Sequence, residues 1–167
     1  WNTVTHNEKG KVILHRFASA APVVKAKEYW LTQFSGNYKR EATLNEERLS
    51  EGVKILDSKL GIRAHQMRIP SFILSLNGPA KENEGEVLAA SLRWSGSFQF
   101  AFDVDWNKNL RLLTGMNPLG SQYNLERGGT FTTPAILYTY SKQGKGEASR
   151  RFHRWAMANA IRDAEKD

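Results

Sequence analysis

Residues 91–140 read SLRWSGSFQFAFDVDWNKNLRLLTGMNPLGSQYNLERGGTFTTPAILYTY and carry the most regular β pattern of the chain. Apolar residues at positions 98, 100, 102 and 104 alternate with mostly polar ones, which is typical of a strand with one buried face. Residues 106–109 have turn chemistry, and residues 110–116 are predicted to form the returning strand. Two further alternating segments follow before residue 140. We therefore expect one antiparallel meander over this stretch.

The preceding residues also have strand character. Alternation predicts strands at residues 11–18, 28–34, 53–59, 71–76 and 87–94, and Val53 and Ile55 are apolar positions of the third. Residues 44–52 are rich in Glu, Arg and Leu, but strands flank them closely, so we expect a loop or a single turn there. The charged residues 77–86 are expected to form a loop tip that tolerates insertion. The predicted fold class is all-β, an antiparallel β-sandwich.

The hydrophobic period changes after Tyr140. Ala148, Phe152, Trp155, Ala156 and Asn159 recur at helical spacing. We expect a linker at residues 142–146 and then a C-terminal connector α-helix, whose apolar stripe packs on the sandwich or on whatever follows. The predicted domain division is therefore residues 1–141 for the sandwich and residues 142–167 for the linker and helix.

Composition limits the classes of partner. A chain of 167 residues, 40% hydrophobic and 11% aromatic, fits one folded domain. The net charge of +7 is dispersed without a helix-turn-helix, zinc-ligand or RNA-recognition pattern, which favours a solvated basic surface over nucleic-acid binding. No apolar run approaches the roughly 20 residues that cross a bilayer, so we expect no membrane partner. The lack of Cys excludes disulfides and thiolate metal sites, and no phosphate-loop or dinucleotide motif occurs, so neither a metal nor a cofactor is expected.

Two carboxylates invite a catalytic interpretation. Asp103 and Asp105 lie two residues apart on one predicted strand face, which separates their Cα atoms by about 6.5–7 Å. Carboxyl separations of about 5–9.5 Å, as in glycosidases, are then reachable. Glycosidase carboxylates, however, flank a sugar from opposite sides, whereas alternating polar residues also describe the solvated face of an antiparallel sheet. We favour the solvated face and expect no catalytic residue in this chain.

Eight short motifs occur in one order along the chain. They are residues 31–36 (LTQFSG), 65–66 (HQ), 92–98 (LRWSGSF), 115–118 (GMNP), 125–128 (LERG), 131–135 (FTTPA), 139–141 (TYS) and 149–154 (SRRFHR). Together they resemble the N-terminal β-supersandwich domain of family 36 glycoside hydrolases, which are chiefly α-galactosidases. The resemblance covers residues 11–155.

This resemblance implies a division of labour within a longer protein. Family members hydrolyse terminal α-galactosides with retention, using two aspartates of a (β/α)8 barrel that follows the supersandwich. A barrel needs about 250 residues, so the resemblance places it downstream of this chain and makes the chain an N-terminally incomplete sandwich. The expected function is to pack on the barrel, support access to its active site and contribute to oligomerisation. The sequence leaves the localisation unknown; of the compartments, the cytoplasm or periplasm of a bacterial-type protein is expected, and the N-terminal signal region is not in this chain.

Four residues are candidates for interdomain or sugar-side contacts: His65, Gln66, Trp106 and Asn117. In the family, His-Gln is followed by His-Asn-Pro, whereas residues 67–70 here are MRIP. The alternative function is a carbohydrate-binding module that uses exposed aromatic rings. Its candidate platform consists of Trp30, Trp94, Trp106 and Tyr123, of which Trp106, beside a turn, is expected to be the most exposed.

Overall fold

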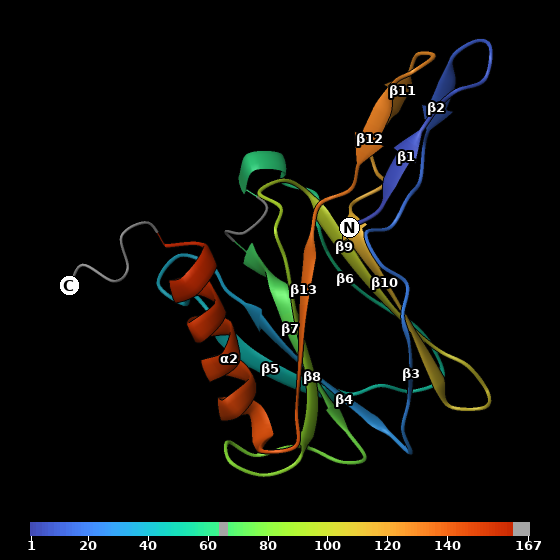
Figure 1. The fold of residues 1–167 in the computed structure, drawn as a ribbon. Coiled ribbons are helices and arrows are strands. Elements are labelled where there is room, and N and C mark those ends of the chain that lie inside the picture. Colours follow the sequence, from blue (N-terminus) through green and yellow to red (C-terminus); the bar gives the residue numbers. More distant parts are fainter. Residues whose placement is uncertain (64–66, 162–167) are drawn as a thin grey trace.

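The computed structural model describes residues 1–63 and 67–161, and they form antiparallel sheets and one C-terminal α-helix (Figure 1). The strands are β1 (Thr3–Thr5), β2 (Val12–Leu14), β3 (Val23–Lys25), β4 (Tyr29–Ser35), β5 (Thr43–Arg48), β6 (Gly52–Ser58), β7 (Arg68–Leu76), β8 (Glu86–Leu92), β9 (Phe98–Val104), β10 (Asn109–Met116), β11 (Tyr123–Leu125), β12 (Thr130–Thr132) and β13 (Ile136–Ser141). A 3-10 turn, η1 (Gly61–Arg63), and helix α2 (Gly144–Asn159) complete the described elements. The predicted all-β sandwich with a C-terminal helix is confirmed.

Two sheets enclose the core. A four-stranded sheet in the order β3-β10-β9-β6 packs on a five-stranded sheet in the order β13-β8-β7-β4-β5. The predicted inward positions of β9, Phe98, Phe100 and Phe102, are fully buried. Phe72 of β7 meets two of them edge-on, with ring centroids 5.3 Å from Phe100 and 4.9 Å from Phe102. Each buried phenylalanine contributes about 1.5–3 kcal/mol, so this row of rings makes a large contribution to the contact between the sheets.

The predicted meander is wrong beyond its first hairpin. β9 and β10 pair as expected, but β11 pairs with β2, β12 with β1 and β13 with β8. The free edge of β10 that a meander needs is already used, because β3 pairs with it and the Ser19 amide donates to the Thr114 carbonyl. Local alternation predicts each strand but carries no information about the partner across an edge.

The short strands form an arm that extends beyond the sandwich, at the upper right of Figure 1. In it, β1 lies beside β12 and β2 beside β11. His6 joins the two loops of the arm, because its amide donates to the Gly129 carbonyl at 3.0 Å and its carbonyl accepts from the Gly128 amide at 2.7 Å. The arm therefore depends on pairing between the beginning of the chain and its last third.

The loop predicted at residues 44–52 is also wrong, because most of it is strand β5. This strand is the edge of the five-stranded sheet, pairs with β4 and exposes side chains on both faces. An edge strand without a buried face has no alternating pattern to detect. The next strand, β6, occurs as predicted, but it buries Leu56 and leaves Val53 and Ile55 on the outer face of its sheet.

Helix α2 covers the outer face of the five-stranded sheet, as its apolar stripe predicted (Figure 1). Ala148 is fully buried against Val87 and Ala89, and Phe152 packs beside them. The helix begins at Gly144, where the amides of residues 144–146 donate to carbonyls of residues 81–85. The loop expected to be a free tip therefore caps the helix. Gly144 has a φ of +74°, and a Cβ there would lie 2.5 Å from the Glu82 carbonyl oxygen, so this close approach requires glycine.

An ion pair ties the helix to the edge of the sheet. Lys145 of α2 contacts Glu46 of β5, whose carboxylate also accepts a 2.7 Å hydrogen bond from Thr32. Burial opposes the charged form of Glu46, but the hydrogen bonds from Lys145 and Thr32 prevail and lower its pKa. The otherwise exposed β5 is thereby linked to α2.

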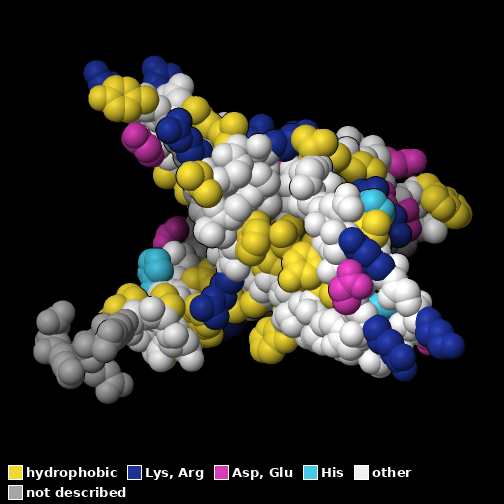
Figure 2. All heavy atoms as spheres, turned by 90° about the horizontal axis from the view of Figure 1, so that it is seen from above, with side chains coloured by type: hydrophobic (Ala, Val, Ile, Leu, Met, Phe, Trp, Pro, Cys, Tyr) yellow, Lys and Arg dark blue, Asp and Glu magenta, His cyan; other side chains and the backbone are white. Residues whose placement is uncertain are grey.

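Within the described residues, the one α-helix lacks the length and hydrophobicity needed to cross a membrane. On the face seen in Figure 2, Lys and Arg side chains lie at several separate places among hydrophobic and acidic ones. The positive charge of this face is thus distributed over it, in keeping with the dispersed charge of the sequence.

Glu147 of α2 makes stability sensitive to acid. Hydrogen bonds from Arg151, Arg154 and Arg150 hold its pKa at about 2, below the ordinary 4.5. Because the folded-state pKa is lowered, the stabilisation is complete above pH 4.5 and disappears as the pH falls towards 2. In the Glu147→Gln variant the unfolding free energy should fall less steeply with pH between 4.5 and 2 than in the wild type. Urea denaturation at several pH values measures this slope. Glu84→Gln, which removes an exposed pair with Lys81, should follow the wild type; equal slopes for both variants would contradict this role.

Candidate functional site

Two of the four candidate contact residues, His65 and Gln66, lie outside the described residues, so their role stays a prediction. The other two, Trp106 and Asn117, are described and occupy very different environments. Trp106 is 79% exposed, as expected, whereas Asn117 is 1% exposed.

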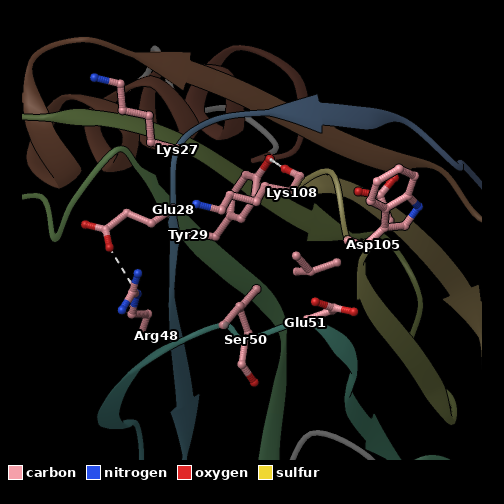
Figure 3. A pocket seen from close by; sticks show the side chains of 11 residues that line it. Lys27, Glu28, Tyr29, Arg48, Ser50, Glu51, Asp105 and Lys108 are labelled. Carbon is pink, nitrogen blue, oxygen red and sulfur yellow. Dashed lines mark hydrogen bonds and ion pairs between the residues drawn. The ribbon is translucent and has the colours of Figure 1, made fainter.

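Trp106 lines a cleft of about 310 Å³ at one end of the sandwich, which we call the hairpin cleft (Figure 3). Three chain connections form it: β3 to β4 with Glu28, β5 to β6 with Ser50 and Glu51, and the β9–β10 hairpin with Asp105. These segments are distant in sequence, and the sandwich brings their ends together. Of the two candidate residues that the structure describes, Trp106 is the one that lines this cleft.

Tyr29 of β4 holds together two of the segments that line the hairpin cleft. Its buried hydroxyl lies 2.7 Å from the Lys108 carbonyl and 2.8 Å from the Val24 carbonyl, and it accepts a 2.8 Å hydrogen bond from the Ala26 amide. Burial raises the pKa of Tyr29, so its hydroxyl remains a neutral donor at pH 7. One side chain therefore joins the β3–β4 connection to the β9–β10 turn.

Asp105 fixes the turn that carries Trp106. Its two carboxylate oxygens accept from the Asn109 side-chain amide at 2.8 Å and the Asn109 backbone amide at 2.7 Å. These two hydrogen bonds lower the pKa of Asp105, so the group is an anionic acceptor at neutral pH. Lys108 completes the turn with a φ of +60°. The turn that precedes β10 is thus held from inside the hairpin.

Across the cleft, a Glu28–Arg48 ion pair of 3.0 Å forms one wall, and Ser50 and then Glu51 continue the lining from Arg48 towards Asp105 (Figure 3). The charged lining residues are Lys27, Arg48, Lys108, Glu28, Glu51 and Asp105. Cations and anions are equal in number, so the cleft offers donors and acceptors without a strong net charge.

Asp103 lies outside the hairpin cleft and has its own partner. Arg111 of the neighbouring strand β10 donates to its carboxylate at 2.6 Å on the outer face of the four-stranded sheet. Asp105 is engaged by Asn109 as described above. Both carboxylates therefore have structural partners, and no cluster of three or more His, Cys, Asp or Glu residues suited to a metal occurs among residues 1–63 and 67–161.

Asn117 organises the loop after β10 from a buried position. Its side-chain amide donates to the carbonyls of Ser58 at 3.2 Å and Phe98 at 3.3 Å, and its Oδ1 accepts from the Leu119 amide at 2.9 Å. The structure gives Asn117 the role of joining β6, β9 and this loop.

The four residues of the candidate aromatic platform do not come together. Trp94 packs against the core and donates to the Ser97 carbonyl at 3.1 Å, whereas Trp30 is half-buried on β4. Tyr123 lies in the arm, where its ring packs 4.5 Å from that of Phe131. Trp106 is the member of the group that lines the hairpin cleft.

The sequence did not indicate the neighbours of Trp106. Arg48 is the last residue of β5, and Glu51 follows that strand, in the stretch for which the sequence predicts a loop. Glu28 directly precedes β4. Their proximity to Trp106 results from the pairing of non-adjacent strands, which no local spacing reveals. The glycine at position 52 was a signal in the sequence for a turn just after Glu51, because glycine readily adopts positive φ. In the structure its φ is +111°.

Comparison with protein families gives a match to the glycosyl hydrolase family 36 N-terminal domain over residues 1–126. Alpha-galactosidase C of Emericella nidulans is 31% identical over 159 residues, which cover 95% of this chain and 21% of that protein. Alpha-galactosidase AgaA of Geobacillus stearothermophilus is 29% identical over an alignment of 173 positions that covers 100% of this chain and 24% of that protein. The chain spans less than a quarter of the length of these curated relatives.

Solved structures give the same result. The alpha-galactosidase from Lactobacillus brevis superposes on 93% of this chain with a TM-score of 0.86 and 29% identity, and the match covers 21% of that structure. A G. stearothermophilus AgaA variant in complex with stachyose superposes on 96% of this chain with a TM-score of 0.89 and 27% identity, and the match covers 22% of that structure. Identity above 25% and superposition over nearly the whole chain support common ancestry as well as a common fold.

Removing the Tyr29 hydroxyl should loosen the hairpin cleft. Tyr29→Phe leaves a buried amide and two carbonyls without that partner and is expected to cost about 1–3 kcal/mol of unfolding free energy. Chemical denaturation measures this loss, and hydrogen exchange of the Ala26 amide should increase. Tyr38→Phe is the matched control, because Tyr38 is 80% exposed. Equal stability of the two variants would show that the hydroxyl does not hold the connections together.

Proposed function

This chain belongs to the N-terminal domain family of family 36 glycosyl hydrolases, and we propose that it is a non-catalytic domain of a larger α-galactosidase. In that protein, a barrel outside this chain hydrolyses terminal α-galactosides with retention. The domain packs on the barrel, supports access to the active site and contributes to oligomer contacts.

The observation that carries this proposal is the share of the relatives that the chain spans. It matches alpha-galactosidases over nearly its whole length but over only 21–24% of theirs. Within residues 1–63 and 67–161 the structure holds sheets and one α-helix, whereas a (β/α)8 barrel alternates eight strands and eight helices. Both observations support a catalytic machinery that lies in the unmatched length.

A surface suited to packing lies on the outer face of the four-stranded sheet. Across the strands, Ile55 of β6 is in register with Ala101 of β9, which is in register with Leu113 of β10. Val53 and Val23 flank the neighbouring row, with exposed fractions of 61% and 57%. The Asp103–Arg111 pair lies between Val53 and Val23 in that neighbouring row. Exposed apolar side chains grouped on a sheet face are typical of an interface, and we assign this face to the interdomain contact.

A comparison of activities tests the catalytic assignment. The full-length protein is expected to hydrolyse an aryl α-galactoside, and residues 1–167 alone are expected not to. In the full-length protein, Asp103→Asn and Asp105→Asn should leave kcat unchanged, because both carboxylates have structural partners. Circular dichroism shows whether each protein is folded. Activity in residues 1–167, or loss of kcat in a folded Asp103→Asn variant, would move the catalytic groups into this chain.

The interface assignment has its own test. Ile55→Lys places a charge on the outer face, and a charge without a partner in an apolar interface is costly. The melting temperature of the full-length protein should fall, by roughly 2–4 °C for each kcal/mol lost in a domain of this size. Residues 1–167 alone should tolerate the change, because Ile55 is 46% exposed there. Leu44→Lys on the edge strand β5 is the control; if it destabilises the full-length protein equally, the assignment is wrong.

A further inference from the structure

The hairpin cleft contains an exposed indole, that of Trp106, on a hairpin whose backbone is fixed by hydrogen bonds. Trp106 is 79% exposed, although tryptophan is usually buried for its large apolar area. The hairpin that carries it is fixed by Asp105 from inside and by Tyr29 from below. A rigid aromatic group in an open position loses little conformational freedom on binding and is therefore suited to contact a ligand.

The other side chains of the cleft select for a neutral polar ligand. Three cationic and three anionic residues line it, so neither an anion nor a cation is strongly favoured. Glu51, an acceptor, and Ser50, which both donates and accepts, lie on the side of the cleft that the β5–β6 connection supplies (Figure 3). A ligand with one apolar face and several hydroxyl groups matches this arrangement.

The size of the cleft agrees with a small ligand. Its volume of about 310 Å³ lies at the lower end of the roughly 300–1,000 Å³ found for small-molecule sites. Pyranose rings have an apolar face of C–H groups that stacks on indole, and their hydroxyl groups both donate and accept. We propose that the hairpin cleft is a non-catalytic saccharide-binding site, in which Trp106 stacks on one pyranose ring and Glu51 and Ser50 bind its hydroxyl groups.

This site is separate from the interdomain packing proposed above. Trp106 follows the end of β9, whereas Ile55, Ala101 and Leu113 lie within their strands on the outer face. Binding in the cleft therefore does not require the outer face to be free. The two proposals can fail independently.

The test uses the full-length protein and three neutral sugars: lactose, maltotriose and raffinose. Lactose and maltotriose contain no α-galactoside that the proposed catalytic site could hydrolyse, so the part of their binding that depends on Trp106 reports on the hairpin cleft. Saturation-transfer NMR and tryptophan-fluorescence titration should show saturable binding of at least one of these two sugars. Trp106→Ala should weaken it by at least about tenfold, as for a central contact residue. Trp106→Phe should retain part of the affinity, since a phenyl ring still offers a flat apolar face.

Trp1→Ala is the matched control, because Trp1 is 75% exposed and does not line the cleft. It should bind each sugar as the wild type does, and melting curves should show that all variants are folded. Glu51→Gln should weaken binding several-fold without changing the melting temperature. The proposal is overturned if the wild type binds neither lactose nor maltotriose, or if Trp106→Ala binds them unchanged. Saturable binding of adenosine monophosphate in the cleft, with no sugar binding, would also overturn it by identifying a different ligand class.

Discussion

The edge-on contact of Phe72 with Phe100 and Phe102 is the interaction on which the other features depend. It joins the central strand β7 of one sheet to the central strand β9 of the other. With these rings in place, both strands have a fixed inner face, and every strand paired to them inherits its orientation because side chains alternate. The outward position of Ile55 and the direction of the β9–β10 hairpin both follow from this single layer.

The same layer determines where function can reside. A sandwich uses its inner faces for stability, so partners meet its outer faces, its edges or its connections. Here α2 occupies one outer face, anchored by Ala148 and by the Lys145–Glu46 pair. The other outer face carries the exposed side chains of Val53 and Ile55 beside the Asp103–Arg111 pair, and the connections at one end form the hairpin cleft. Tyr29 links core to cleft, since its ring is part of the core and its hydroxyl holds the cleft floor.

The sequence predicted those elements that bury a regular face. Alternation located β9 and β10, and helical spacing located the stripe of α2 that includes Ala148 and Phe152. It failed at β5, because an exposed edge strand has no buried face, and at the meander, because strand partners are chosen by long-range packing. The turn beside Trp106 predicted that this residue is exposed. The sequence did not predict that Arg48 and Glu51 lie near Trp106, because their proximity depends on non-local strand pairing.

Evolution of a longer enzyme can use such a domain in two ways at once. An apolar, well-ordered outer face stabilises interdomain packing, and the partner surface limits which substitutions are tolerated there. Connections at the end of a sandwich tolerate more sequence change than its strands do, and here Tyr29 and Asp105 fix their backbone by hydrogen bonds. An exposed tryptophan at that end has a solvation cost that packing within this chain does not offset. Under the proposal made above, a ligand covers the ring of Trp106, and a saccharide is the ligand class whose apolar face and hydroxyl groups fit the surrounding side chains.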